Sequence, residues 1–228
     1  EVEKLLINTF KKGSGKKLMY DAFPKISYSD ALLKYGTDKP DLRNPLIIND
    51  ISEIFLRDDV SFEIFKKLVN NGSKARCIVT KKTKDKPRSF FDNIDKWAKS
   101  EGASGLAYFT IEKDDKISAK GPIGKFFSED SLKEIMNKTK ADVGDSIFLA
   151  CGKQKELEKI TAAARDKIAK DLNLIDENTF AFCWIVDYPM FEKDEQTNQI
   201  GFSHNPFSMP QGEIDKINFE KPLNILAI

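Results

Sequence analysis

The stretch Ser146-Ile-Phe-Leu-Ala-Cys151, followed at once by residues 153–172, decides the fold of this chain. The first part is a run of apolar and small residues with the length of a strand buried in a sheet. The second part repeats apolar side chains at helical spacing, namely Leu157, Ile160, Ala164, Ile168 and Leu172. Its opposite face is charged, as on a helix that covers a core on one side only. The sequence therefore predicts a buried strand followed by a long amphipathic helix.

Further strand and helix patterns lie on both sides of this stretch. Apolar runs with strand character occupy residues 62–69, 75–80, 106–111, 180–186 and 200–202, and another begins at Ile117. Helical spacing begins at Val2 and recurs after Ser27, Ser89 and Ser128, and serine is favoured at the N-cap of a helix. The turn 70–73, Asn-Asn-Gly-Ser, joins the first two runs and predicts a hairpin.

The order of these patterns indicates the fold class. The middle of the chain reads as two strands, a helix, two strands and a helix, with a further strand and helix behind. This order favours an α+β domain with two layers and a mixed, largely antiparallel sheet over a βαβ fold. Residues 37–45 hold two prolines and four charged side chains, which predicts a rigid, irregular connector before that domain.

Composition excludes several classes of function. The 37 basic and 36 acidic residues nearly cancel, so no global field attracts nucleic acid. The longest apolar run, residues 180–186, is far shorter than the roughly 20 residues needed to span a bilayer. Cys77, Cys151 and Cys183 lie inside apolar runs and form no Cys-x-x-Cys pair. We interpret them as small buried hydrophobic residues of a cytoplasmic protein, rather than as metal ligands or disulfide partners.

Two lysine-rich segments invite a phosphate-binding interpretation. The segment 11–17 lacks a glycine five positions before Gly15, and Lys16 is followed by lysine rather than serine or threonine, so it is not a phosphate-binding loop. The segment 81–88, Lys-Lys-Thr-Lys-Asp-Lys-Pro-Arg, is first of all a solvated loop. A local contact with RNA phosphates is the alternative.

The single histidine is the strongest candidate for a binding residue. His204 lies in a polar return that follows the apolar run 180–186 and Asp187. A buried strand that ends in such a return can present a polar side chain to a ligand pocket. The alternative is a solvated loop histidine without function.

Several stretches together resemble one family. Tyr35-Gly-Thr-Asp-Lys-Pro-Asp-Leu-Arg43 and Phe23-Pro-Lys-Ile-Ser-Tyr-Ser-Asp-Ala precede the α+β region, which contains Pro122-Ile-Gly-Lys-Phe126 and Val143-Gly-Asp-Ser-Ile-Phe-Leu149. Trp184-Ile-Val-Asp-Tyr-Pro-Met-Phe-Glu192 and His204-Asn-Pro-Phe-Ser-Met-Pro210 follow it. In this order they resemble the bacterial-type aspartyl-tRNA synthetases of class II, with the GAD insertion domain in the middle.

The resemblance implies an internal fragment with three parts. Residues 1–44 and 175–228 would be segments of the catalytic sheet, and residues 45–174 would be the GAD insertion. The parent enzyme would activate aspartate with ATP and Mg²⁺ and transfer it to tRNA, as a cytoplasmic homodimer without a membrane partner. The ATP-binding motifs of the family are missing, so we expect no cofactor in the fragment and no activity from it. We also expect slower amide exchange in residues 60–150 than in the flanks.

The resemblance also implies roles for individual residues. His204 would bind the carboxylate of aspartate, and Asn205 stands where many relatives have a second histidine that can become charged. Asp38, Lys39 and Arg43 are candidate substrate contacts, with a hinge of ion pairs as the alternative. No catalytic residue and no metal ligand is assigned in this chain.

Two other functions compete with a ligase fragment. One is a non-catalytic RNA- or partner-binding GAD module like that of an amidotransferase subunit, which leaves the stretch 184–210 unexplained. The other is a structural domain without a ligand. Weak, salt-sensitive binding of bulk tRNA would favour the RNA-binding module.

Overall fold

The computed structural model describes residues 1–194, 197–203 and 208–227 of the chain. The chain divides into two compact units. One unit is continuous and consists of residues 33–177, and the other is formed by both ends of the chain, residues 1–32 and 178–228. The predicted boundaries at residues 44 and 174 differ from this division, because residues 33–44 belong to the continuous unit.

The continuous unit is built on a five-stranded sheet with the strand order β3-β4-β7-β5-β6. Every pair of neighbours is antiparallel. The strands are β3 (Ile48–Asp50), β4 (Lys74–Thr80), β5 (Ala107–Lys113), β6 (Ile117–Lys120) and β7 (Ser146–Gly152). The mixed α+β class and the largely antiparallel sheet are therefore confirmed.

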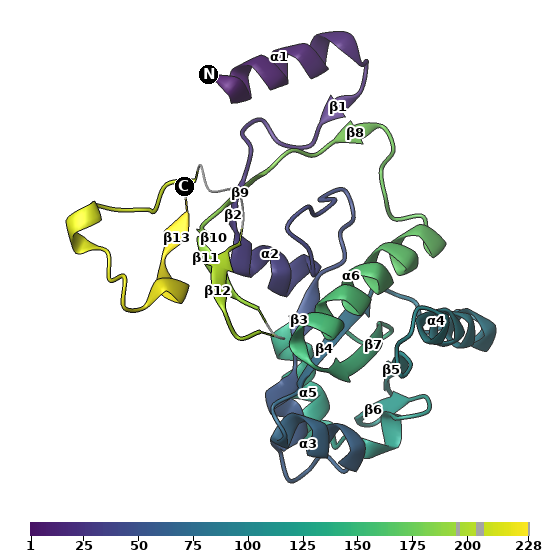
Figure 1. Cartoon of the computed structure of the whole chain (residues 1–228). Coiled ribbons are helices and arrows are strands. Elements are labelled where there is room, and N and C mark those ends of the chain that lie inside the picture. The colour runs from purple at the N-terminus through teal and green to yellow at the C-terminus, as the bar shows by residue number, and fades with distance from the viewer. Residues whose placement is uncertain (195–196, 204–207, 228) are drawn as a thin grey trace. The chain divides into compact units, whose positions relative to one another are not determined.

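Helices cover both faces of this sheet, so the unit has three layers and the predicted two-layer architecture is wrong. One face carries η1 (Ser52–Leu56), α3 (Glu63–Asn70), η2 (Gly124–Phe126) and α5 (Glu129–Thr139), and the other carries α4 (Arg88–Ser100) and α6 (Gln154–Asp171) (Figure 1). Along β7, Ile147 and Leu149 belong to the first core, whereas Phe148 and Ala150 belong to the second. The uninterrupted apolar run of this strand reflects burial on both faces.

The strand predicted over residues 62–69 is a helix, α3, so the predicted hairpin and the predicted order of strands and helices are wrong as well. Phe62, Phe65 and Val69 pack against one core, and their spacing of three and four residues is helical. Ile64 on the other side of α3 is 65% exposed. The turn that follows ends this helix, with the Asn71 N–H donating to the Lys67 carbonyl. The short strand β3, which the sequence analysis did not predict, forms the edge of the sheet beside β4.

Two of the three serines predicted at helix N-caps occupy that role. The Ser128 hydroxyl accepts from the backbone N–H of Ser131 at 3.0 Å at the start of α5, and Ser27 accepts from Asp30 N–H at 3.2 Å at the start of α2 (Tyr28–Tyr35). Ser89 is not a cap. The helix α4 begins one residue earlier, at Arg88, because Pro87 with its fixed φ of −61° occupies the cap position.

The unit formed by the chain ends contains short strands in pairs. Its helix α1 spans Val2–Gly13, as the sequence predicts. The strands are β1 (Lys17–Leu18), β2 (Lys25–Ser27), β8 (Thr179–Phe180), β9 (Trp184–Val186), β10 (Tyr188–Pro189), β11 (Phe191–Lys193), β12 (Ile200–Phe202) and β13 (Leu226–Ala227). Two short 3₁₀ turns, η3 (Ile214–Lys216) and η4 (Pro222–Asn224), lie before β13. Parallel pairs β1–β8 and β2–β9 join the two ends of the chain.

The apolar run 180–186 is not one strand but is split between β8 and β9. Its two parts pair with different strands, because the segment between β1 and β2 is longer than the segment between β8 and β9. A single straight strand cannot match both partners. The strand β12 pairs antiparallel with β11.

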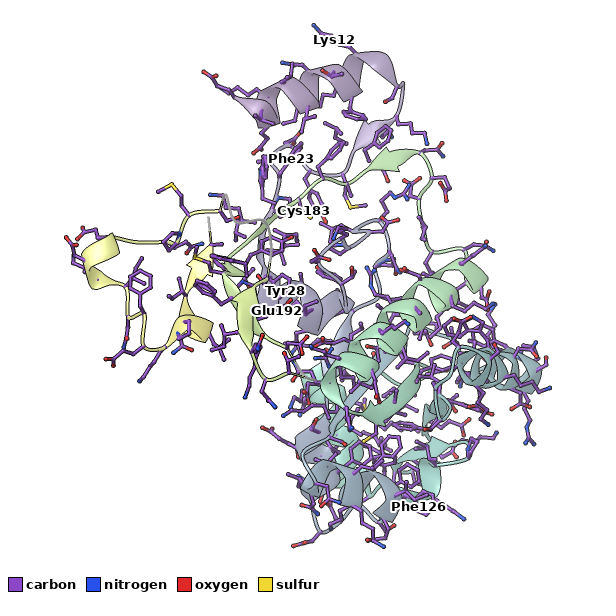
Figure 2. All side chains as sticks on the ribbon, in the orientation of Figure 1. Lys12, Phe23, Tyr28, Phe126, Cys183 and Glu192 are labelled. Carbon is purple, nitrogen blue, oxygen red and sulfur yellow. The ribbon has the colours of Figure 1, made fainter. Side chains whose placement is uncertain are left out.

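An aromatic cluster packs this unit beneath α1. It contains Phe10, Phe23, Phe180, Phe182 and Trp184, with ring centroids 4.8–6.2 Å apart in the neighbouring pairs. Glu3 on α1 accepts hydrogen bonds from the Phe23 backbone N–H at 2.8 Å and from the Trp184 indole N–H at 3.2 Å. These two donors lower the pKa of the Glu3 carboxyl. Phe23 is labelled in Figure 2.

Candidate functional site

The parallel pair β2–β9 presents the first candidate site at its carboxyl ends. The pair ends with Ser27 opposite Val186, and Asp187 follows directly with a positive φ of 59°. A residue other than glycine in this left-handed region is uncommon and is found more often at binding sites than elsewhere. Ligands of parallel sheets bind outside the carboxyl ends of the strands. The end of β9 therefore has the backbone geometry of a ligand site.

Polar and aromatic side chains gather around Asp187. The Gln211 amide donates to an Asp187 carboxylate oxygen and to the Ala227 carbonyl, both at 3.0 Å. The rings of Tyr28, which is labelled in Figure 2, and Tyr188 lie 4.9 Å apart. A carboxyl group has two oxygens and can accept several hydrogen bonds, so Asp187 can also accept from an ammonium or hydroxyl group of a ligand.

The residue assigned to the carboxylate of aspartate, His204, and its neighbour Asn205 lie outside the described residues. The described residue next to them, Ser203, is held firmly. Its N–H donates to the Met190 carbonyl at 3.1 Å, and its hydroxyl donates to the Pro189 carbonyl. Ser203 thus lies beside residues 189 and 190, which follow Asp187 closely in the chain.

The second candidate region, residues 37–43, contains the other three assigned residues. Arg43 forms a two-pronged ion pair with Asp41, with Nη2–Oδ2 and Nε–Oδ1 distances of 2.7 and 2.9 Å. The Lys39 ammonium lies 2.8 Å from a carboxylate oxygen of Asp38. The hydrogen bonds from Arg43 lower the pKa of the Asp41 carboxyl and raise the pKa of the Arg43 guanidinium. The charged groups of this segment are therefore paired with each other.

A buried arginine on α6 binds the backbone of the same segment. Arg165 is 1% exposed and donates to three backbone carbonyls, those of Asp41, Asn44 and Leu46, at 2.7–2.9 Å. Its guanidinium also lies over the Tyr35 ring at 5.0 Å from the centroid. Burial lowers the pKa of this guanidinium, because the charged form loses its hydration. These bonds explain why residues 33–44 belong to the continuous unit.

Glycine is required at one point in this region. Gly36 has a φ of 71°, and a Cβ at this position would lie 2.6 Å from the Glu158 carbonyl oxygen of α6. The backbone of the segment thus touches the backbone of α6 directly. Together with Arg165, this contact makes residues 35–46 a braced joint.

Sequence reasoning did not identify Asp187, Gln211 or Arg165 as important. Asp187 had a usable signal, because it follows a buried strand directly. Arg165 had no such signal in the sequence, because it lies among the charged residues of a helix, which are normally expected on the solvated face. Gln211 reaches Asp187 only through the pairing of β10 with β13.

Among residues 1–194, 197–203 and 208–227, no group of three or more histidine, cysteine, aspartate or glutamate side chains is placed to hold a metal ion. No described helix is long and apolar enough to cross a membrane. Cys77 is buried, whereas Cys151 and Cys183 are half-buried. Burial raises the pKa of Cys151 to about 11 and raises the pKa of the other two thiols as well.

Comparison with known proteins identifies the continuous unit. Residues 65–161 match the family described as the GAD domain. The matched residues run from α3 to α6 and include four of the five strands of the sheet, β4 to β7. This part of the chain is therefore similar to a GAD domain.

Similarity to complete proteins extends over both flanks. An aspartate–tRNA(Asp/Asn) ligase of Pelagibacter ubique is 74% identical over 99% of this chain, and the corresponding ligase of Acidiphilium cryptum is 48% identical over 99%. A third, from Ehrlichia chaffeensis, is 46% identical over the same share. The chain spans about 38% of the length of these relatives. It therefore corresponds to a segment of aspartate–tRNA ligases that contains the GAD domain.

Proposed function

We propose that this chain is a part of an aspartate–tRNA ligase, and that the complete ligase attaches aspartate to tRNA. The observation that carries this proposal is the similarity of 74% over 99% of the chain, which includes both flanks and not only the GAD domain. A GAD module of another protein class would account for residues 65–161 but not for the flanks. The relatives are ligases for tRNA(Asp/Asn), so the tRNAs for aspartate and for asparagine are both candidate substrates.

The reaction of the complete ligase would proceed in two steps. The carboxylate of aspartate attacks the α-phosphate of ATP and displaces pyrophosphate, which gives aspartyl-adenylate. A hydroxyl of the terminal adenosine of the tRNA then takes the aspartyl group, and AMP leaves. Such transfers depend on fixed donors and cations around the reacting groups. Mg²⁺ would neutralise phosphate charge in the first step, but the described residues offer no group to hold it, so we assign no metal step to this chain.

The flanks would contribute one wall of the aspartate pocket. The pairing of β2 with β9 supports this role, because it brings residues 25–27 and 184–186 into one small parallel sheet. At the end of that sheet, Asp187 is oriented by Gln211 and can accept from the ammonium group of aspartate. His204, which directly follows the anchored Ser203, would donate to the carboxylate of the same ligand.

The neighbour of His204 limits the pH dependence of this pocket. Asn205 can donate a hydrogen bond but cannot become charged. Any titration of the pocket near neutral pH would then come from His204 alone.

The residues of the braced joint would act indirectly. Asp38, Lys39 and Arg43 are engaged in ion pairs with Asp41 or with each other. We infer that these ion pairs stiffen the segment 35–46, rather than bind the substrate. The complete ligase would act as a homodimer.

The test uses the complete coding sequence that contains this chain. We expect the complete ligase to catalyse aspartate-dependent exchange of pyrophosphate into ATP, and the 228-residue chain alone to show none. Loss of a single fixed charge donor already costs about 10²–10³ in rate, and the chain lacks several. Exchange by the purified chain, or a complete ligase that prefers another amino acid, would contradict the proposal.

Single substitutions in the complete ligase test the assigned roles. His204→Gln should raise the KM for aspartate at least about tenfold while leaving the KM for ATP unchanged, since it removes one charged partner of the carboxylate. Lys39→Gln is the matched control, because it changes a cation of the joint and should leave both constants near the parent values. Equal effects of the two substitutions would refute the assignment of His204.

A further inference from the structure

A basic pocket lies within the continuous unit, at the edge of the sheet where β6 ends. It has a volume of about 510 Å³, which is in the range of small-molecule sites. Four cationic side chains line it, and they come from the loop after β4, from the start of α4 and from β6: Lys84, Lys86, Arg88 and Lys120. Neither the GAD-domain match nor the proposed ligase reaction assigns a role to this pocket.

The loop that carries these cations is fixed by buried hydrogen bonds. Asp145 is 2% exposed and accepts from the Lys82 N–H at 2.9 Å and from the Lys81 ammonium at 2.8 Å. Thr83 is also buried, and its hydroxyl bonds to the Ser146 hydroxyl at 2.8 Å. The backbone of the loop is therefore preorganised, and a ligand bound there would not have to order it.

A second, independent feature points into the same pocket. Tyr108 lines it and is only 8% exposed, and its ring is stacked on Phe91 with centroids 4.5 Å apart. Among the residues that the structure describes, none is a hydrogen-bond partner of the Tyr108 hydroxyl. Within the described residues, the Tyr108 hydroxyl is not one of the fully buried side-chain atoms that lack a partner, so it is accessible, and it can donate a hydrogen bond to an acceptor atom of a ligand.

The charge of the pocket selects the class of ligand. Of the four cations, Lys120 is shared with Glu112 at 3.6 Å and Arg88 with Asp92 at 3.4 Å. Lys84 and Lys86 have no ion-pair partner among the described residues, and they are therefore available to an anion. The helix α4 begins at the pocket without a side-chain cap, and its N-terminal dipole also favours negative charge.

We infer that this pocket binds the phosphate group of a nucleotide, with Lys84, Lys86 and the Tyr108 hydroxyl as its contacts. The volume is larger than a bare phosphate requires and accommodates a nucleoside beside it. Glu112 supplies a carboxylate that can accept from a ribose hydroxyl or a base amino group. A free nucleotide and a nucleotide within single-stranded RNA present the same chemistry, and the experiment separates them.

The experiment titrates the ¹⁵N-labelled 228-residue chain with four probes and follows its amide shifts. The probes are 5′-AMP, adenosine, inorganic phosphate and a single-stranded oligoadenylate with internal phosphates only. We expect 5′-AMP or the oligoadenylate to shift the amides of residues 84–88 and 108–110, and adenosine to leave them in place. Stronger binding of the oligoadenylate identifies RNA as the source, and stronger binding of 5′-AMP identifies a free nucleotide.

Three variants test the named contacts. Lys84→Gln with Lys86→Gln should weaken the preferred nucleotide probe at least about tenfold and flatten its salt dependence, since two phosphate contacts are lost. Tyr108→Phe removes only the hydroxyl and should weaken it several-fold, about the loss expected for one hydrogen bond. Lys67→Gln with Lys74→Gln removes the same charge outside the pocket and should leave the affinity near the parent value.

Several results would overturn the inference. They are the absence of shifts with both nucleotide probes, equal shifts with adenosine, inorganic phosphate binding as tightly as 5′-AMP, and equal weakening by the control pair of lysines. None of these results bears on the proposed ligase function, because the titration measures binding to this chain and needs no aspartate, ATP turnover or charged tRNA.

Discussion

Replacing Arg165 with methionine should destabilise the continuous unit by about 3 kcal/mol, the cost typical of removing one partner from a buried charged network. The arginine donates three hydrogen bonds to backbone carbonyls in residues 41–46 and is 1% exposed. Hydrogen bonds from a charged group contribute about 1.5–3 kcal/mol each. Their sum overstates the loss, because methionine removes the desolvation penalty that lowers the pKa of this guanidinium.

The assay is urea unfolding followed by tryptophan fluorescence in a Trp184→Phe background. Trp97 is then the only tryptophan, and it packs against the core beneath α4 and α6. Arg165→Met should lower the urea midpoint clearly. The urea midpoint of Arg165→Lys should lie between those of the parent chain and Arg165→Met, because one ammonium group cannot reach three carbonyls with the geometry of a guanidinium.

The matched control lies on the same helix. Lys167→Met removes the same charge but only a partly exposed ion pair with Asp171, whose oxygens lie 2.6 Å from the ammonium. Such pairs contribute about 0.3–0.5 kcal/mol. If Arg165→Met and Lys167→Met shift the midpoint equally, the bonds of Arg165 do not hold the joint, and our account of residues 33–44 fails.

Three further predictions concern single residues. Ser128→Ala removes the N-cap of α5 and should cost about 1 kcal/mol in thermal unfolding, and a loss near zero would mean that the cap contributes nothing. Gly36→Ala should destabilise the chain by more than about 1 kcal/mol, because its Cβ would meet the Glu158 carbonyl. Gly72 also has a positive φ but open space around it, so Gly72→Ala should destabilise the chain clearly less. The reverse order of the two losses would refute the close contact at Gly36. Arg57 and the Ser128 hydroxyl lower the pKa of Asp59 from 3.8 to about 2, so its contribution to stability is present above pH 4 and is lost as the pH falls toward 2. A carboxyl NMR titration should show this midpoint and its rise toward 3.8 in Arg57→Gln, and an ordinary midpoint in the parent chain would contradict the pairing.

Local sequence determined the elements whose signals are short in range. The helices after Ser27 and Ser128 begin where a serine hydroxyl meets a backbone N–H three residues later, which is a property of a few neighbouring residues. The same holds for the long helix after β7, whose apolar spacing matched its buried face. The resemblance to the synthetase family was also carried by contiguous motifs, and similarity over 99% of the chain agrees with it.

Tertiary structure alone decided the number of layers, the partners of the strands and the contents of both candidate sites. Residues 62–69 have a composition that suits a strand or a helix, and packing against one face of the sheet selected the helix. The apolar run 180–186 divided between two partners that lie more than 150 residues earlier in the chain. Arg165 became a structural residue because the carbonyls of residues 41–46 meet it there, and no local pattern encodes contacts between residues so far apart in sequence.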